Sequence, residues 1–393
     1  MEAFYRTHAY LVEHTNALVR RNLMDEIDWD ERLIGIKGTR GVGKTTFLLQ
    51  YAQEKYGKDR SCLFVNMNNF YFSGHSIVEL ALEFQRQGGK VLLIDQVFKR
   101  PNWSAELRTC YERFPKLKIV FTGSPIMQLE DGNNQLKGIV KSYNLRGFSF
   151  REFLNLNAGT NFRPYTLKDI LQHHTTIAQE VCSKVSPLEH FQNYLYYGFY
   201  PFFLEKQNFS ENLLKTMNMM IEIDILLIKQ IELKYLSRIK KLLYLLAMNG
   251  AKTPNVSQLA KAIGTSRATA MNYIHYLAEA RLINMVYPIG ESFPKKPARI
   301  MLHNTNLMYP IYSVKTDEQN VLETFFTNAL WKGHKVNISD KGTHLIIDER
   351  TPFKILNTEE TRTKNPPDMV YICPKATVGK DNAIPIWLFG FLY

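Results

Sequence analysis

Residues 38–45 read Gly-Thr-Arg-Gly-Val-Gly-Lys-Thr and carry the most specific chemical signal in the chain. They match the spacing G-x-x-x-x-G-K-[ST] of a phosphate-binding loop. Glycines let backbone N–H groups approach phosphate oxygens without an obstructing Cβ, and the start of the following helix adds partial positive charge. The predicted nucleotide-binding residues are Gly38, Thr39, Arg40, Gly41, Val42, Gly43, Lys44, Thr45 and Thr46.

This loop also predicts the cofactors, ATP and Mg²⁺. We expect Lys44 to reach the β- and γ-phosphates and the Thr45 hydroxyl to bind the metal. A second metal residue is predicted at Asp95, which ends the apolar run "KVLLID" and would hold Mg²⁺ through a water. The alternative for Asp95 is a carboxylate that only caps the end of a strand.

Gln96 follows Asp95 where many ATPases of this kind place a glutamate that activates the attacking water. A carboxylate can accept a proton from water and an amide cannot, although a glutamine can still orient water, as in small GTPases. Hydrolysis is therefore expected to be slow. Ser124 ends "LKIVFTGS", where a residue sensing the γ-phosphate would lie. Gln96 and Ser124 are the predicted catalytic residues.

The elements that must position these residues alternate between strand and helix. Short apolar runs predict strands at 33–36, 61–67, 90–95 and 117–124, and amphipathic patterns predict helices at 45–56, 77–87 and 103–114. Such alternation predicts an α/β fold with a mostly parallel sheet and helices on both faces. Ligands of such sheets bind at the carboxyl ends of the strands, where Asp95 and Ser124 would lie beside the phosphate loop.

Length and composition agree with a folded protein of two to four domains. The 393 residues are 45% hydrophobic, and 49 Lys and Arg against 37 Asp and Glu give a net charge of +12. This surplus favours phosphate-bearing partners, although many proteins this basic have none. The four cysteines show no CxxC spacing, which argues against a zinc site or disulfide framework and predicts a cytoplasmic protein. No secretory signal or membrane span is expected, and the C-terminal "IPIWLFGFLY" is predicted to be a buried strand.

Residues 31–154 resemble AAA+ ATPases of bacteria and archaea, of a type common in Bacteroidetes. The resemblance rests on "IDWDERLIGIKGTRGVGKTTFLLQY", "LLIDQVFKRPNWSAEL", "KIVFTGSP" and "GFSFREFL", and continues through "YLYYGFYPFFLE", "LHNTNLMY" and "ETFFTNAL". It implies an ATPase domain at 1–155, a helical lid or bridging region at 156–235, a winged helix at 236–300 and a small α+β restriction-endonuclease-like domain at 301–393. The winged helix would present Arg267, Asn272 and His275 on its recognition helix.

Several positions depart from this family's pattern. The family's Asp-Glu-Val-His is Asp95-Gln96-Val97-Phe98 here, and two arginines that usually precede "GFSFRE" are replaced by Gly138 and Ile139. An aspartate after the second strand is Asn68. The lost arginines favour natural decay of the site over an engineered Gln96 that traps nucleotide.

The nuclease-like domain departs from the pattern as well. Glu323 is retained, whereas an Asp and a Glu of the metal site are replaced by Thr343 and Lys354. The alternative is a shift in alignment that leaves Asp348 or Glu349 as a substitute ligand. Because a Mg²⁺ site needs acidic oxygens, we expect no nucleic-acid cleavage.

The resemblance and its departures together predict an ATP–Mg²⁺-binding AAA+ protein with weak or lost hydrolysis, which couples nucleotide state to the winged helix and an inactive nuclease-like domain. One alternative is an active ATPase that uses Gln96 and an arginine supplied in trans. Another is a DNA-binding or protein-interaction module whose nucleotide is structural. The expected partners are ATP or ADP, with nucleic acid at the winged helix and a further protein left open. The oligomeric state is not predicted.

Overall fold

The computed structural model describes residues 1–130, 132–205, 208–312, 317–356 and 368–393. The chain divides into two compact units, Met1–Arg146 and Gly147–Tyr393. Within the described ranges, no helix combines the length and the apolar character needed to cross a membrane.

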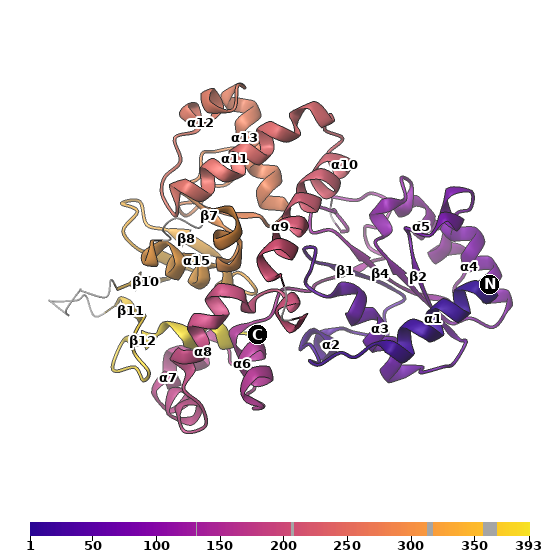
Figure 1. Ribbon diagram of the computed structural model, residues 1–393, viewed down its shortest axis with the longest axis horizontal. Coiled ribbons are helices and arrows are strands. Elements are labelled where there is room, and N and C mark those ends of the chain that lie inside the picture. Colours follow the sequence, from indigo (N-terminus) through magenta and orange to yellow (C-terminus); the bar gives the residue numbers. More distant parts are fainter. Residues whose placement is uncertain (131, 206–207, 313–316, 357–367) are drawn as a thin grey trace. The chain divides into compact units, whose positions relative to one another are not determined.

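The first unit is a parallel α/β sheet, as the alternation of strand and helix predicts. Its five strands lie in the order β2-β3-β4-β1-β5 and all pairs are parallel. The helices α1 and α3 pack together on one face of this sheet, and α4 and α5 pack together on the other (Figure 1). The strands are β1 (Leu33–Lys37), β2 (Cys62–Asn66), β3 (Val91–Asp95), β4 (Lys118–Gly123) and β5 (Lys141–Asn144). The helices are α1 (Glu2–His14), α2 (Leu23–Glu26), α3 (Lys44–Lys55), α4 (Ile77–Arg86) and α5 (Trp103–Arg113).

The register of this sheet brings the carboxyl ends of the central strands together. Lys37 at the end of β1 pairs with Gly123 at the end of β4, and Asp95 at the end of β3 pairs with Asn66 of β2. The central strands are nearly all buried, which is typical of parallel strands covered on both faces. The segments that follow β1, β3 and β4 therefore share one edge of the sheet.

The second unit begins with helices and a small ribbon. Helices α11 and α12 each pack against α13, and the antiparallel pair of β6 and β7 follows. The helices up to the ribbon are α6 (Phe150–Ala158), α7 (Leu167–Cys182), α8 (Pro187–Asn193), α9 (Phe209–Met219), α10 (Leu226–Ile228), α11 (Leu236–Asn249), α12 (Val256–Ala262) and α13 (Arg267–Glu279). Two π-helical turns, Tyr194–Gly198 and Met220–Ile225, extend α8 and α9.

The chain ends in a second, mixed sheet with the order β12-β11-β10-β9-β8. The pairs β8–β9 and β9–β10 are antiparallel, and β10–β11 and β11–β12 are parallel. The remaining strands and helices are β6 (Ile283–Val286), β7 (Arg299–Leu302), α14 (Met308–Ile311), α15 (Glu318–Leu330), β8 (Val336–Ile338), β9 (Leu345–Ile347), β10 (Thr351–Ile355), β11 (Val370–Cys373) and β12 (Ala383–Pro385).

The C-terminal segment corrects one expectation from the sequence. The prediction of a buried terminal strand is right about burial, but only β12 is extended, and Ile386–Phe391 form a 3₁₀ helix. Trp387 and Phe389 in this helix are fully buried, and Phe389 packs against Phe326 of α15 with ring centroids 4.8 Å apart. A run of apolar residues this short fits a buried strand or a buried helix equally well, so its pattern could not decide.

Candidate nucleotide-binding site

The predicted phosphate loop connects β1 to α3. Gly41 and Gly43 have φ angles of 80° and 91°, in the left-handed region that favours glycine. Gly38 is restricted by space, because a Cβ there would lie 2.5 Å from the backbone oxygen of Leu145. Thr39 and Val42 are buried and anchor the loop to the unit. The glycine spacing thus has a local structural reason at each of these three positions.

Lys44 is the first residue of α3, and its side chain folds back over the loop. Its ammonium donates to the carbonyl oxygen of Gly38 at 2.7 Å and to that of Thr39 at 2.8 Å. The ammonium is therefore held within the curve of the loop, beside the start of a helix whose dipole favours an anion.

Asp95 is the most highly connected acid of the site. Its carboxylate is 1% exposed and accepts three hydrogen bonds, from the Thr45 hydroxyl at 2.9 Å, the Asn66 amide at 2.8 Å and the Thr122 hydroxyl at 2.5 Å. A buried carboxylate needs such donors to stay in place. The two predicted metal residues, Thr45 and Asp95, are brought into direct contact.

This pair fits the chemistry of Mg²⁺, which in phosphate-transferring sites takes one or two protein oxygens and completes its shell with water and phosphate. A cage built from protein alone would look different. Among the described residues there is no group of three His, Cys, Asp or Glu that could hold a metal by itself.

Gln96 and Ser124 lie at the same edge of the sheet as the loop. Gln96 has φ 57° and ψ 47°, and its backbone N–H donates to the Thr122 hydroxyl at 3.0 Å. Its half-buried side chain makes no hydrogen bond to any described residue. Ser124 follows β4 and is 2% exposed. The Thr122 hydroxyl thus bonds both the Asp95 carboxylate and the backbone of Gln96, and it fixes the position of residue 96 relative to Asp95.

Three residues of this site were missed from the sequence: Asn66, Thr122 and Arg21. Asn66 is the last residue of β2 and Thr122 the last but one of β4, so the available signal was their place near the carboxyl ends of predicted strands. Arg21 gave none, because it precedes the first strand. Its guanidinium is buried and donates to the Val42 carbonyl at 3.2 Å and to the Arg146 carbonyl at 2.8 Å, so it braces the loop from outside.

The two positions at which the sequence resemblance predicts lost arginines carry no charge. Gly138 and Ile139 lie in a turn before β5, where Gly138 has φ 77° and open space around its Cα. Arg40, inside the loop, lies over the ring of Phe98 at 5.7 Å. Phe98 takes the place of the histidine in the sequence pattern and is buried.

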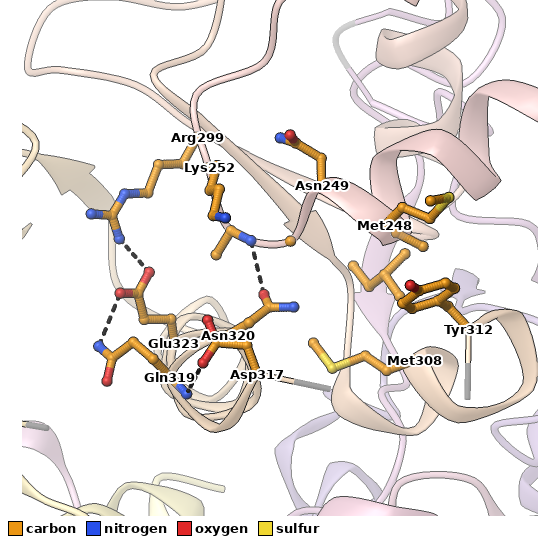
Figure 2. A pocket seen from close by; sticks show the side chains of 14 residues that line it. Met248, Asn249, Lys252, Arg299, Met308, Tyr312, Asp317, Gln319, Asn320 and Glu323 are labelled. Atoms are coloured by element: carbon orange, nitrogen blue, oxygen red, sulfur yellow. Dashed lines mark hydrogen bonds and ion pairs between the residues drawn. The ribbon is translucent and has the colours of Figure 1, made fainter. Parts of the chain in front are cut away.

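In the second unit, Glu323 of α15 lines a cavity of about 230 Å³, shown in Figure 2. Arg299 of β7 forms an ion pair with one carboxylate oxygen of Glu323, and the Gln319 amide donates to the other at 3.1 Å. Arg299 also donates to the Gly342 carbonyl at 2.7 Å. The charge of Glu323 is therefore neutralised by an arginine of the same unit.

The other candidate acids lie elsewhere. Thr343 precedes β9, on the side of Gly342, whereas Asp348 and Glu349 form the turn that follows β9. Asp348 accepts from His334 at 2.7 Å, and although burial raises the pKa of Asp348, the hydrogen bonds from His334 and the Lys335 backbone lower it overall. Lys354 lies in β10. Asp348 and Glu349 therefore follow β9, whereas Gly342, which shares Arg299 with Glu323, precedes it.

The predicted recognition helix is α13, and its face differs from expectation at one residue. Arg267 and Asn272 are exposed, as predicted. His275 is not, because its ring stacks on Phe293 with centroids 4.0 Å apart, and burial lowers its pKa although Glu279 opposes the shift. The sequence could not show this contact, since Phe293 lies in the connection between β6 and β7.

Comparison with known proteins finds a family match within residues 30–154. Residues 30–154 match the family model of an AAA domain, which covers the loop, Asp95, Gln96 and Ser124, and residues 188–303 match a domain of unknown function, DUF8612. The chain is 26% identical over 282 residues to the uncharacterized protein MJ1637 of Methanocaldococcus jannaschii. That match covers 68% of this chain but 59% of the relative, less than two thirds of its length.

Several solved structures are similar at low identity. PCH-2 of C. elegans is 14% identical, with a TM-score of 0.25 over 44% of this chain and 48% of that chain. The replication initiator DnaA bound to AMPPCP and single-stranded DNA is 13% identical, with a TM-score of 0.27 over 69% of this chain and 92% of that chain. AMPPCP-bound DnaA from Aquifex aeolicus is 12% identical, with a TM-score of 0.23 over 70% and 88%. The similarity to AAA domains therefore rests on the family match at residues 30–154.

Proposed function

We propose that the protein binds ATP with Mg²⁺ at the phosphate loop of its AAA domain and hydrolyses it slowly or not at all. The observation that carries this proposal is the arrangement of Lys44 within the loop and of Thr45 against Asp95 at its end. Lys44 and the loop N–H groups would bind the β- and γ-phosphates, and the Thr45 hydroxyl and Asp95 would hold the metal. Bound Mg²⁺ would neutralise charge on the phosphate oxygens.

Slow hydrolysis is proposed from two features of the site. The residue beside Asp95 is Gln96, whose amide cannot take a proton from the attacking water. The positions of the two family arginines are Gly138 and Ile139, and an arginine that contacts the transition state contributes about 10³–10⁵ to the rate of phosphoryl transfer. Both changes spare the groups that bind nucleotide.

The second unit would respond to nucleotide state. In this proposal residues 156–235 form a bridging region, 236–300 a winged helix and 301–393 an inactive nuclease-like domain. The helices α11 to α13 followed by the β6–β7 ribbon support the winged helix. The ion pair between Arg299 and Glu323 supports the loss of nuclease activity, since it places a guanidinium where a cation would have to bind. We further propose a cytoplasmic protein.

The test is a thermal-shift titration of the full chain with ATP and Mg²⁺. Ligand at 100 times its dissociation constant should stabilise the fold by about 2.7 kcal/mol. Lys44→Ala should remove this shift, because the loop loses its one ammonium for the β- and γ-phosphates. The matched control is Lys58→Ala, an exposed lysine of the same unit. A shift that survives in Lys44→Ala contradicts the proposal.

An active ATPase is the second candidate, and one observation favours it. The side chain of Gln96 is half-buried and unbonded within the described residues, so it could turn toward a water at the γ-phosphate. In this version another subunit supplies the missing arginine. Turnover per subunit that rises with protein concentration supports this candidate, and turnover that stays flat and low supports the first.

A further inference from the structure

A broad hollow in the second unit, of about 730 Å³, is bordered by three separate segments of chain. They are residues 251–253 after α11, residues 288–299 from the connection after β6 to the start of β7, and residues 338–342 from the end of β8 into the connection to β9. Each segment contributes at least one cationic side chain. We call this hollow the basic groove and define it by Lys252, Lys296, Arg299 and Lys341.

The lysines of the basic groove have no ion-pair partner among the described residues that would account for their charge. Lys252, Lys296 and Lys341 are exposed, and none of the three ammonium groups makes a hydrogen bond or ion pair to a described residue. Of the two acids that line the groove, Glu291 is paired with Lys295 outside it at 2.9 Å, and Asp340 is exposed. Three unpaired ammonium groups around one hollow give it a positive potential that an anion would relieve.

Arg299 links this groove to the smaller cavity at Glu323. Both Arg299 and Lys252 line the two hollows, and Figure 2 shows them across from the α15 residues Gln319 and Glu323. Because Arg299 neutralises Glu323, that carboxylate does not repel an anion bound next to it. The same ion pair engages the Glu323 carboxylate, so we expect a phosphodiester bound beside it to be held without being cut.

The lining of the groove indicates which part of a ligand it recognises. Among the described residues that border it there is no aromatic side chain, so bases have nothing to stack on. What the groove offers is ammonium groups together with the hydroxyls of Thr253 and Ser339, which are donors typical of contacts to phosphate. A positively charged groove that follows the backbone is one way in which proteins bind single strands without sequence preference.

We propose that the basic groove binds the phosphate backbone of a single nucleic-acid strand, without preference for sequence. The site lies in the second unit and is independent of the ATP site proposed above. Its salt dependence follows from the number of phosphates neutralised, because each contact to a single strand contributes about −0.7 to the slope of log K against log salt.

The experiment measures fluorescence anisotropy of a labelled 20-nucleotide oligo-dT with the full chain, without ATP, at several salt concentrations. We expect binding that weakens steeply with salt. Lys252→Ala, Lys296→Ala and Lys341→Ala should each weaken binding several-fold and reduce the slope by about 0.7. The matched control is Lys375→Ala, an exposed lysine in the turn after β11, which removes the same charge elsewhere and should leave the slope unchanged.

The outcomes separate this proposal from its rivals. Absence of binding, or three groove variants that behave like Lys375→Ala, overturns it. Preferential competition by duplex DNA, or displacement by inorganic phosphate at concentrations similar to those of the oligonucleotide, overturns the single strand as ligand. Equal melting temperatures exclude unfolding of the variants. Because Lys44→Ala should keep strand binding while the groove variants keep the ATP shift, failure at one site is distinguishable from failure at the other.

Discussion

Gln96 combines a left-handed backbone at the end of β3 with a side chain that no described residue engages. Residues in sparsely populated backbone conformations often mark functional sites, since the fold must hold them there. The backbone N–H of Gln96 is fixed by Thr122, which also bonds the Asp95 carboxylate. The backbone position of residue 96 is therefore coupled, through Thr122, to the carboxylate of Asp95, the predicted metal residue.

A glutamate at this position should restore proton transfer. We expect Gln96→Glu to raise phosphate release at least several-fold, because a carboxylate near the γ-phosphate can accept the proton of the attacking water and an amide cannot. Single-turnover phosphate release, with Gln96→Ala as the control for loss of the amide alone, measures this. An unchanged rate in Gln96→Glu, with ATP binding intact, would mean that the missing arginines or an absent partner limit turnover.

The residues of this site differ in how far the sequence could reveal them. The loop is a motif of consecutive residues, and Asp95 ends an apolar run that forms one strand. Both features are local in sequence, so their positions in the fold could be predicted. Arg21 acts across the fold, because its guanidinium joins the carbonyls of Val42 and Arg146, which are far apart in sequence. No local pattern encodes such a contact.

At the scale of elements, the turn from β1 into the phosphate loop depends on close approach of the backbone after β5. Leu145 donates its N–H to the Lys37 carbonyl at 2.8 Å, so it cannot retreat from β1, and its oxygen would lie 2.5 Å from a Cβ at position 38. A methyl group at Gly38 must therefore displace the loop. Overpacking of this kind costs about 1–3 kcal/mol.

We expect Gly38→Ala to weaken ATP binding by about tenfold or more, because the displaced loop no longer directs its N–H groups at the phosphates. The control is Gly74→Ala, where φ is −118° and no atom lies within 4 Å of the added Cβ. Titration of both variants with a fluorescent ATP analogue gives the comparison. Equal affinities would show that the loop tolerates the shift.

The contact of α1 with β2 makes the first unit sensitive to pH. His8 is buried, its Nδ1 accepts from the Phe64 N–H at 3.0 Å, and burial lowers its pKa. The folded state therefore keeps a neutral ring, whereas the unfolded chain takes up a proton near the ordinary histidine pKa of about 6.5. Stability is full above that pH and is lost as pH falls below it, because the unfolded state then binds more protons.

Urea unfolding at pH 7.5, 6.0 and 5.0 tests this dependence. We expect His8→Asn to lower stability at pH 7.5 but to lose less between pH 7.5 and 5.0 than the natural protein does. His14→Asn is the matched control, since His14 lies exposed on the same helix and should leave the pH dependence as it is. A pH dependence unaltered by His8→Asn would assign the effect to other groups.

The elements of the first unit also show what local pattern can and cannot predict. Strands β1 to β4 and helices α3 to α5 were predicted, because apolar runs and helical periodicity both reflect burial in a parallel sheet. Strand β5 was not, since Lys141-Ser142-Tyr143-Asn144 is polar and forms only through pairing with β1. An edge strand of this kind is determined by the partner that it meets.

At the scale of the whole molecule, the segment "GFSFREFL" belongs to the second unit. Ser149 caps α6 through a capping box with Glu152, and Phe150 packs against Phe191 and Phe391 with centroids 5.1 and 6.1 Å apart. Arg151 donates to the carbonyl of Tyr393, the last residue. The compact first unit ends at Arg146, whereas the match to the AAA family model continues to residue 154 and the sequence predicts a domain over 1–155.

The division of the chain at Arg146 predicts how fragments behave. Residues 1–146 should fold alone and keep the ATP-dependent thermal shift, because the loop, Asp95 and Arg21 with both of its carbonyl partners lie inside this range. A fragment of residues 1–158 would add α6 without its packing partners and expose Phe150 and Phe153, both almost fully buried in the intact chain. Size-exclusion chromatography should show a single species for the shorter fragment and aggregates for the longer one.

Phe150→Ser with Phe153→Ser in the longer fragment should restore the single species, since it removes the exposed rings and leaves the length unchanged. If the shorter fragment fails to bind ATP while the intact chain binds it, the nucleotide site depends on the second unit and the division at Arg146 is not a functional one.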